Sequence, residues 1–224
     1  MTCKKFKLIG LTGSTGLLGQ SLKKKLRKLN NYKLNCYKGD ITNKSQLKKW
    51  FKVNSFCYVI HLAAIVPVKK VNKNINFAKK VNIGGTKNII NEVNKKKSIK
   101  WFFFSSSSHV YQFNNKEVRE TSIKKPFSIY GKTKLEAEKF IEKKINKKIK
   151  FCVGRIFSLE GKNKAKSYFL PGLLKKIRKN KVIEIDLNQF RDFIHVDDVA
   201  EAVVILLKKE QVGIYNIASG KKTR

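Results

Sequence analysis

A chain of 224 residues, 42% of them hydrophobic, is long enough to bury one large core and is not disordered in composition. No apolar run could span a bilayer, and the N-terminus lacks the apolar stretch of a signal peptide, so we expect a cytoplasmic protein. The four cysteines are scattered, without a CxxC pair, which indicates reduced thiols and no metal site.

The net charge of +36 could indicate nucleic-acid or membrane binding. However, the charge is nearly all lysine, spread over most predicted helices and loops. Asn and Ile, which share A/T-rich codons with Lys, are also very common. Arg is scarce, whereas a nucleic-acid surface favours Arg forks and exposed aromatics. We therefore interpret the charge as codon bias, expect no membrane binding, and keep nucleic-acid binding as a minor alternative.

The first predicted elements are a strand, a tight turn and a helix over residues 7–20. Gly13, Gly16 and Gly19 lie at three-residue spacing across the turn. In a dinucleotide-binding fold, one glycine permits the turn, one lets the pyrophosphate approach and one lets the helix pack on the strand. The helix N-terminus favours that anion. Because glycine is also the default turn residue, the prediction depends on the flanking strand and helix.

The first helix is expected over 17–29, and a short strand over 32–37. In an NAD-binding fold, an acidic residue at the end of the second strand holds the ribose hydroxyls. Here Cys36, Tyr37 and Lys38 occupy that end. The missing acid weakens a strict NAD assignment and leaves room for the 2′-phosphate of NADP.

A helix is expected over 45–53, and a strand over 56–62 whose continuous apolar run is typical of a parallel strand buried on both faces. Small residues at its end, Ala63 and Ala64, would let a cofactor approach the backbone. The neighbouring His61 is interpreted as a structural histidine, because a lone histidine there is more often structural than catalytic.

A long helix over 76–93 contains Asn82 followed by Gly84 and Gly85. A polar residue and two glycines are costly in the middle of a helix. We therefore expect close packing or a local distortion of the helix at this point.

The next strand, over 99–105, opens into four serines. A helix over 130–147 then begins with Tyr130 and Lys134, which share one helix face because they are four residues apart. An ammonium close to a phenol lowers the phenol's pKa from about 10 towards neutrality, so such a tyrosine can exchange protons with a substrate oxygen. The same spacing arises by chance in a Lys-rich chain, so alone it is weak evidence.

The remaining pattern alternates strands and helices. It predicts a strand over 149–156, a helix over 170–179, a strand over 182–185, a helix over 199–207 and a strand over 214–217. Alternation throughout the chain indicates an α/β fold, a doubly wound parallel Rossmann sheet with helices on both faces.

These motifs together resemble the extended short-chain dehydrogenase/reductase family, in its NAD-dependent epimerase/dehydratase group, which acts on nucleotide sugars. The matching segments are collinear and cover essentially the whole chain. They are TGSTGLLG at 12–19, GDIT at 39–42, VIHLAA at 59–64, VNIGGTKN at 81–88, SSSSHVY at 105–111, YGKTK at 130–134, GRIF at 154–157, RDFIHVDDVAEAV at 191–203 and YNIASG at 215–220.

The resemblance implies a role for each matching residue. Catalysis would use Ser107, Tyr130 as the acid/base and Lys134 as its partner, and substrate binding would use Ser158 and Arg191. The implied cofactor residues are Gly13, Gly16, Gly19, Asp40, Ile41, Ala63, Ala64, Asn82, Lys134 and Phe157.

Four departures from the family pattern matter. The region before Asp40 is short, as in the deoxysugar reductases. Ser158 stands where epimerases usually carry Asn. Ser108 and His109 stand where the dehydratases carry an Asp-Glu pair, so the acid and base of their elimination step are missing. Relatives usually continue past the segment at 215–220 and complete a substrate lobe there.

We therefore expect a Rossmann domain over 1–156 and a partial, interleaved substrate-binding region over 157–224. The predicted function is an NAD(P)-dependent epimerase or 4-keto reductase acting on a nucleotide sugar, as a possible homodimer. Between NAD and NADP the missing acid slightly favours NADP. The alternative is a non-catalytic or inactive, truncated NAD(P)-binding protein.

Overall fold

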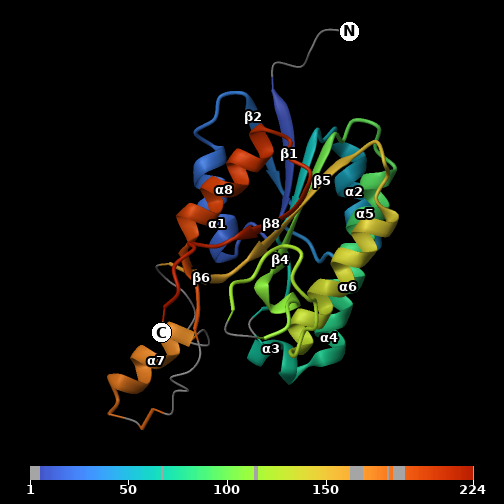
Figure 1. The fold of residues 1–224 in the computed structure, drawn as a ribbon. Coiled ribbons are helices and arrows are strands. Elements are labelled where there is room, and N and C mark those ends of the chain that lie inside the picture. Colours follow the sequence, from blue (N-terminus) through green and yellow to red (C-terminus); the bar gives the residue numbers. More distant parts are fainter. Residues whose placement is uncertain are drawn as a thin grey trace.

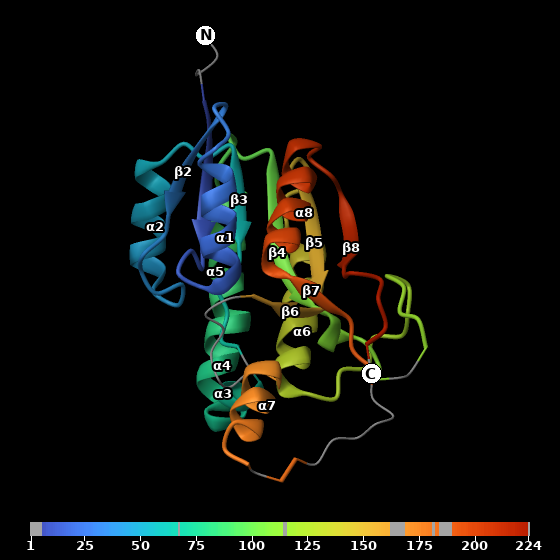
Figure 2. The ribbon, with the colours of Figure 1, turned by 90° about the vertical axis from the view of Figure 1, so that its left-hand side faces the viewer.

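A six-stranded parallel sheet forms the centre of the protein. The computed structural model describes residues 6–66, 68–113, 116–161, 169–180, 182–183 and 190–223. The strand order is β2-β1-β3-β4-β5-β8, and every neighbouring pair is parallel (Figure 2). The strands are β1 (Lys7–Thr12), β2 (Tyr32–Cys36), β3 (Tyr58–His61), β4 (Trp101–Ser107), β5 (Lys150–Ile156) and β8 (Gly213–Ile217).

Helices cover both faces of this sheet, as the predicted doubly wound fold requires (Figure 1). Helices α1 (Leu17–Leu26) and α8 (Val196–Lys208) pack together on one face. Helices α2 (Lys44–Val53), α5 (Thr86–Asn94) and α6 (Ile129–Lys144) lie on the other face. The predicted Rossmann class is therefore confirmed.

The first four residues of β4 are all apolar because both faces of this strand are buried in the core. Side chains of a strand alternate between the two faces of the sheet. Accordingly Trp101 and Phe103 pack in the layer of α1 and α8, and Phe102 and Phe104 pack in the opposite layer. All four side chains are almost completely buried.

The predicted distortion in the long helix is also confirmed. Helix α4 (Ile75–Lys79) runs into a π-helical turn, η1 (Lys80–Gly85), before α5 begins. A Cβ at Gly85 would lie 2.4 Å from the side chain of Ile41, so glycine allows the close packing here. A short helix before it, α3 (Val68–Lys73), was not predicted.

The region between β5 and α8 differs most from prediction. It contains a second, two-stranded parallel sheet of β6 (Ser158–Glu160) and β7 (Phe193–His195), too short to show a sequence period. The predicted strand over 182–185 is not seen at its first two residues, and the other two lie outside the described residues. Helix α7 (Phe169–Ile177) is present as expected and extends away from the sheet (Figures 1 and 2).

The polypeptide after β5 does not form a separate layer. Helix α8 packs on α1, and β8 extends the main sheet beside β5. Helix α8 begins three residues earlier than predicted because the side chain of His195 caps it, accepting a hydrogen bond from the Asp197 amide at 3.3 Å.

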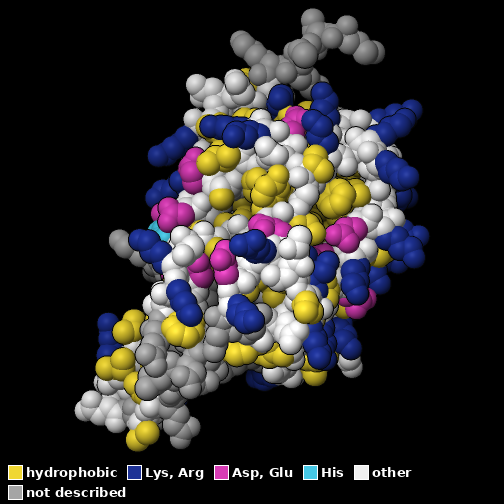
Figure 3. All heavy atoms as spheres, in the orientation of Figure 1, with side chains coloured by type: hydrophobic (Ala, Val, Ile, Leu, Met, Phe, Trp, Pro, Cys, Tyr) yellow, Lys and Arg dark blue, Asp and Glu magenta, His cyan; other side chains and the backbone are white. Residues whose placement is uncertain are grey.

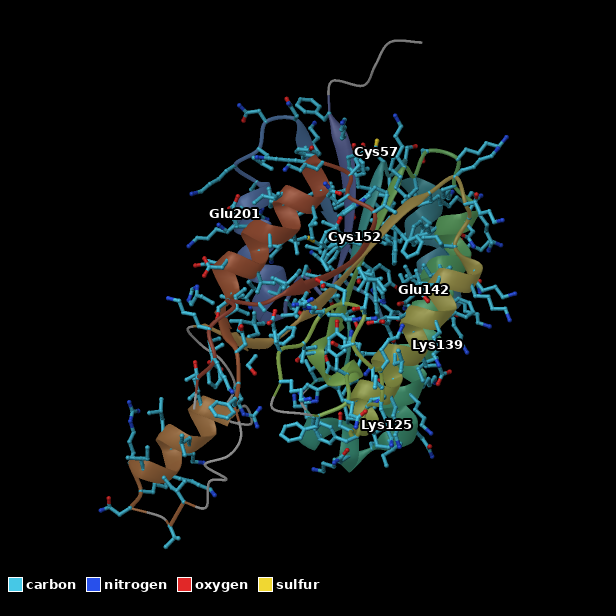
Figure 4. All side chains as sticks on the ribbon, viewed as in Figure 1. Cys57, Lys125, Lys139, Glu142, Cys152 and Glu201 are labelled. Atoms are coloured by element: carbon cyan, nitrogen blue, oxygen red, sulfur yellow. The ribbon has the colours of Figure 1, made fainter. Side chains whose placement is uncertain are left out.

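The basic side chains are spread over the surface and the described cysteines are unpaired, as expected from the sequence. On the face in Figure 3, Lys and Arg side chains are spread among acidic ones and do not form a single patch. Cys36, Cys57 and Cys152 are free thiols; Cys57 directly precedes β3 and Cys152 lies in β5 (Figure 4). None of the helices in the described ranges is both long and apolar enough to cross a membrane.

Candidate active site

A cavity of about 1550 Å³ lies at the carboxyl ends of the central strands. Loops after β1 and β3 lead to helices on opposite faces there, which is the usual ligand-binding position of an open α/β sheet. Of the predicted site residues, only Asn82 does not line this cavity. The lining residues include Gly13, Gly16, Gly19, Asp40, Ile41, Ala63, Ala64, Ser107, Tyr130, Lys134, Phe157, Ser158 and Arg191.

The three glycines of the first turn have three different roles. Gly13 has a φ of 73°, and a Cβ there would lie 2.6 Å from the amide nitrogen of Ala63. A Cβ at Gly19 would lie 2.2 Å from the carbonyl oxygen of Gly13, so this glycine lets α1 pack on the turn. At Gly16 the nearest atom to such a Cβ is 3.4 Å away. Only Gly16 therefore leaves open space that a ligand can use.

The N-terminus of α1 is suited to an anion. Gly16 is its N-cap residue and offers no side-chain hydrogen bond to the first amides, and the first turn contains no acidic residue. The unpaired N–H groups and the helix dipole therefore face the cavity without competition from a carboxylate.

His61 is a structural residue, as predicted. It is completely buried and does not line the cavity. Its Nδ1 lies 2.6 Å from Thr12 Oγ1 and its Nε2 lies 3.0 Å from Thr86 Oγ1. Because the Thr86 hydroxyl donates to the carbonyl of Asn82 at 2.7 Å, Nε2 must be the protonated nitrogen. Burial, with a smaller contribution from Lys134, lowers the pKa of His61 to about 3.

The Asn82 side chain connects the loop after β3 to α6. Its Oδ1 accepts from the Ile65 amide at 2.7 Å, and its Nδ2 donates to the Ile65 carbonyl and to Thr133 Oγ1. The Thr133 hydroxyl in turn donates to the Tyr130 carbonyl at 2.8 Å. Asn82 thus supports the site from behind and does not reach the cavity.

Helix α6 is fixed at its start by a cap and a close contact. The Ser128 hydroxyl accepts a hydrogen bond from the Gly131 amide at 3.0 Å, a standard N-cap interaction. A Cβ at Gly131 would lie 2.1 Å from the carbonyl oxygen of His109. The first turn of α6, which carries Tyr130, is therefore held directly against the segment that follows β4.

Lys134 lies one turn further along α6 and is 2% exposed. Its ammonium donates to the Ser105 carbonyl at 2.7 Å and lies 4.7 Å from the centre of the Phe104 ring. Desolvation lowers its pKa to about 7, although the charge of Glu138 acts in the opposite direction. The pKa of a buried lysine shifts strongly when a further charged or hydrogen-bonding group binds beside it.

The structure distinguishes the three serines that end β4. Ser105 presents its carbonyl to Lys134, and the Ser106 hydroxyl donates to the carboxylate of Glu138. Ser107, at the end of β4, accepts from the His109 amide at 3.3 Å and lines the cavity. Within the described residues its hydroxyl donates to no acceptor, so Ser107 is the serine suited to bind a ligand.

A buried ion pair behind the site was missed from the sequence. The Arg155 guanidinium, which is fully buried, meets Glu138 with an Nη2–Oε2 distance of 2.7 Å and an Nε–Oε1 distance of 3.2 Å. It also donates to the Tyr111 hydroxyl at 2.9 Å, and that hydroxyl donates to Asn216 at 2.6 Å. Burial alone would lower the pKa of Arg155, but the bonds to Glu138 and Tyr111 outweigh it and raise this pKa. The pair joins α6 to β5.

Basic residues line the cavity at both ends. Lys23 of α1, the α1 C-cap residue Arg27, and Lys38, two residues after β2, line it. Asp40 also lies there, but its carboxylate accepts from the amide and the hydroxyl of Thr42 at 2.8 and 2.9 Å. At the other end lies Arg191, whose pKa is lowered by burial. No cluster of metal-binding side chains occurs within the described ranges.

Comparison with known proteins identifies the family. A sequence model of the NAD dependent epimerase/dehydratase family matches residues 9–218. The chain therefore belongs to the NAD dependent epimerase/dehydratase family.

Similar proteins act on nucleotide sugars. UDP-glucuronate 4-epimerase of Thermodesulfobacterium geofontis is 32% identical over 200 residues, an alignment that covers 88% of this chain and 61% of that protein. A putative UDP-glucose 4-epimerase of Methanocaldococcus jannaschii is 30% identical, over 96% of this chain and 78% of that protein. The chain is thus shorter than both relatives.

Solved structures agree with the fold. UDP-glucuronic acid 4-epimerase from Bacillus cereus, in complex with UDP-glucuronic acid and NAD, has a TM-score of 0.86 and 25% identity, over 96% of this chain and 79% of that one. A dTDP-4-dehydrorhamnose reductase from Bacillus anthracis, in complex with NADP, has a TM-score of 0.84 over 99% of this chain and 78% of that one. At 22% identity, it supports the fold alone.

Proposed function

We propose that the protein is an NAD(P)-dependent epimerase or 4-keto reductase of nucleotide sugars. One observation carries this proposal: Tyr130 and Lys134, one turn apart on α6, line the same cavity as Ser107 and the glycine turn. The similarity to nucleotide-sugar epimerases supports the substrate class.

The residues present fit a nicotinamide dinucleotide. The open space at Gly16 and the uncapped start of α1 suit a pyrophosphate. Ala63 and Ala64 would border the channel and Phe157 would lie by the nicotinamide, while Asp40 and Ile41 would border the adenine. When bound, the dinucleotide would supply hydride transfer, and the protein would supply binding, orientation and electrostatics.

Three basic residues that line the cavity, Lys23, Arg27 and Lys38, favour NADP over NAD. Asp40 is the acid nearest to these cations in sequence, and its carboxylate already accepts two hydrogen bonds from Thr42. A 2′-phosphate would be attracted by the three cations. We expect Arg27→Ala to weaken NADP binding more than NAD binding, measured by competitive titration. An equal effect on both cofactors would contradict this preference.

In the proposed mechanism Tyr130 is the acid/base. Its hydroxyl would exchange a proton with the reacting oxygen of the sugar, and Ser107 would donate a hydrogen bond to that oxygen. The Lys134 ammonium would favour the phenolate and hold the nicotinamide ribose. Arg191 would bind the diphosphate of the substrate, and Ser158 would lie beside the sugar. The segments from 157 onward that line the cavity would form the substrate-binding region.

The test is Tyr130→Phe, which removes one oxygen and keeps the ring. We expect unchanged dinucleotide affinity and turnover of an accepted nucleotide sugar that is lower by about 10²–10⁴-fold. Equal turnover by wild type and variant would overturn the catalytic role. Dinucleotide binding without turnover by either protein would instead favour a non-catalytic binding protein.

A further inference from the structure

His109 lines the candidate active site but has no role in the chemistry proposed so far. It lies in η2 (Ser108–Val110), the 3-10 turn that follows β4, and is half-buried. Ser107 precedes it by two residues, and Arg191 is near enough to affect its titration. The imidazole therefore lies at the sugar end of the cavity.

Three contacts fix the His109 ring. Its Nδ1 lies 3.3 Å from the hydroxyl of Ser128. One face stacks on Phe127, with ring centroids 5.9 Å apart, and the ring meets Tyr130 at a steep angle with centroids 5.6 Å apart. The carbonyl of His109 also lies against Gly131, so the backbone here packs directly on the first turn of α6.

These contacts favour one position for the imidazole hydrogen. The Ser128 hydroxyl accepts from the Gly131 amide, and Nδ1 of His109 is the acceptor that the described residues place within reach of the hydroxyl proton. Donation by Ser128 makes Nδ1 an acceptor and places the hydrogen of the neutral ring on Nε2. Burial, together with the nearby charge of Arg191, lowers the pKa of His109 and favours this neutral form.

The aromatic neighbour of His109 is unusually exposed. Phe127 lines the cavity, yet 67% of its surface is accessible. Its outer edge meets Phe113, which is 55% exposed and does not line the cavity. An exposed aromatic face beside a fixed hydrogen-bond donor is suited to a sugar, which has an apolar ring face and polar edges.

We propose that His109 is a substrate-contacting residue that donates a hydrogen bond from Nε2 to a hydroxyl or keto oxygen of the sugar. Phe127, stacked on the imidazole, borders the apolar face of the same sugar. The inference deepens the proposed function and rests on it. It assigns sugar recognition to a side chain on the segment between Ser107 and Tyr130. The residue that binds the sugar and the residue that transfers the proton are then positioned by the same packing of η2 against the start of α6.

The test compares binding of UDP with binding of UDP-sugars. His109→Phe keeps a ring against Phe127 and Tyr130 but cannot donate a hydrogen bond, whereas His109→Gln retains a donor near the position of Nε2. We expect His109→Phe to lower affinity for UDP-glucose or UDP-glucuronate by about 10-fold, with unchanged affinity for UDP and for the dinucleotide. His109→Gln should recover most of the loss. Phe113→Leu is the matched control and should change none of these affinities.

Each outcome decides the matter. Loss of UDP-sugar affinity with unchanged UDP affinity supports the inference. Equal UDP-sugar affinity of wild type and both His109 variants overturns it and leaves the proposed function intact. A parallel loss of UDP and UDP-sugar affinity indicates a merely structural role and also overturns it. If wild type binds none of UDP-glucose, UDP-glucuronate and dTDP-glucose, the proposed function fails and the inference fails with it. Should His109→Phe not fold, His109→Leu, which also lacks a donor, takes its place beside His109→Gln, and the same sugar-specific loss is expected for it.

Discussion

The dinucleotide end of the cavity is built from backbone, whereas the side chains at the sugar end are supported by buried polar side chains behind them. At the first end, the turn around Gly13 and the loop at Ala63 approach so closely that a single Cβ would not fit between them. At the second end, Ser107, Tyr130 and His109 are held in place by the polar side chains behind them. Those include the ion pair of Glu138 and Arg155.

This difference predicts different sensitivities to mutation. A backbone site tolerates most substitutions except at its glycines, because few side chains take part in it. A site supported by buried charges depends on each of them, because removing one leaves another unpaired in a medium that solvates it poorly. Mutations can therefore damage either end separately.

The largest effect is expected for Glu138→Leu. This change leaves the Arg155 guanidinium buried without a carboxylate and removes the acceptor of the Ser106 hydroxyl. Breaking a buried pair in this way costs about 3–5 kcal/mol, so the free energy of unfolding should fall by that amount. Chemical denaturation measures it.

The double variant Glu138→Leu, Arg155→Met is the control for this prediction. It removes both charges, so much of the lost stability should return. If the double variant is no more stable than Glu138→Leu, the uncompensated charge is not the cause of the loss.

A matched pair of glycine variants compares the two ends directly. Gly131→Ala places a Cβ 2.1 Å from the His109 carbonyl, so it should lower stability by about 1–3 kcal/mol and reduce turnover, with dinucleotide affinity retained. Gly16→Ala meets no atom closer than 3.4 Å, so stability should stay within about 1 kcal/mol while dinucleotide affinity falls. Thermal unfolding and cofactor titration of both variants test this. If Gly131→Ala lowered dinucleotide affinity and Gly16→Ala lowered stability instead, the two ends of the cavity would not be separable.

Gly13 lies in the same turn, but Gly13→Val is not a clean way to block the pyrophosphate. The positive φ of Gly13 and its contact with Ala63 show that a side chain there would disturb the turn itself. Gly16 is the better position for that test.

Sequence could predict the dinucleotide end because its parts are local. The turn at 13–19 follows directly from a strand, and its glycines are close together in the chain. The distortion near Asn82 was likewise visible as two glycines inside a helix. The strands of the small second sheet were not predicted, because three residues are too few to establish a period.

The support of the sugar end could not be predicted in the same way. Glu138 and Arg155 are 17 residues apart, and only the packing of α6 beside β4 and β5 brings them together. Glu138 is one of three glutamates in the Lys-rich helix α6, and such residues are usually solvated. A usable signal for His109 was its position between Ser107 and Tyr130, but the Ser128 contact that fixes its ring depends on tertiary structure.

A smaller and opposite pair of effects is expected for Lys134→Met. Its folded pKa of about 7 lies below the ordinary value of 10.5, so between these pH values the unfolded chain binds more protons and stability rises with pH. Methionine removes the charge that burial disfavours. At pH 7 the variant should be as stable as wild type or up to about 2 kcal/mol more stable. Its stability should also rise less between pH 7 and 10.

Dinucleotide affinity and turnover should both fall in the same variant, because the proposed ribose contact and the effect on Tyr130 are lost. Denaturation at several pH values measures the stability, and cofactor titration measures the dinucleotide affinity. Lower stability at pH 7 together with unchanged cofactor affinity would assign Lys134 to the structure alone.

The last effect concerns acid stability at the dinucleotide end. His61 is buried as a neutral ring between Thr12 and Thr86, and its pKa is about 3 instead of the ordinary 6.5. Between these values the unfolded state binds one more proton at this position than the folded state. Stability is therefore fully present above about pH 6.5 and falls as the pH decreases, by at most about 1.4 kcal/mol per pH unit from this residue.

His61→Gln removes that titration while its amide can still reach a hydroxyl on either side. We expect a lower stability at pH 7, by about 1–3 kcal/mol, because the ring leaves a gap and imperfect hydrogen bonds. Between pH 6.5 and 4, however, the stability of the variant should fall less steeply than that of wild type. Denaturation series at matched ionic strength measure the two slopes, and the carboxylates common to both proteins cancel in the difference. Parallel slopes would mean that His61 is not the group that is neutral in the folded state and protonated in the unfolded one. The folded state would then also hold a doubly protonated ring, with Nδ1 donating to Thr12 Oγ1.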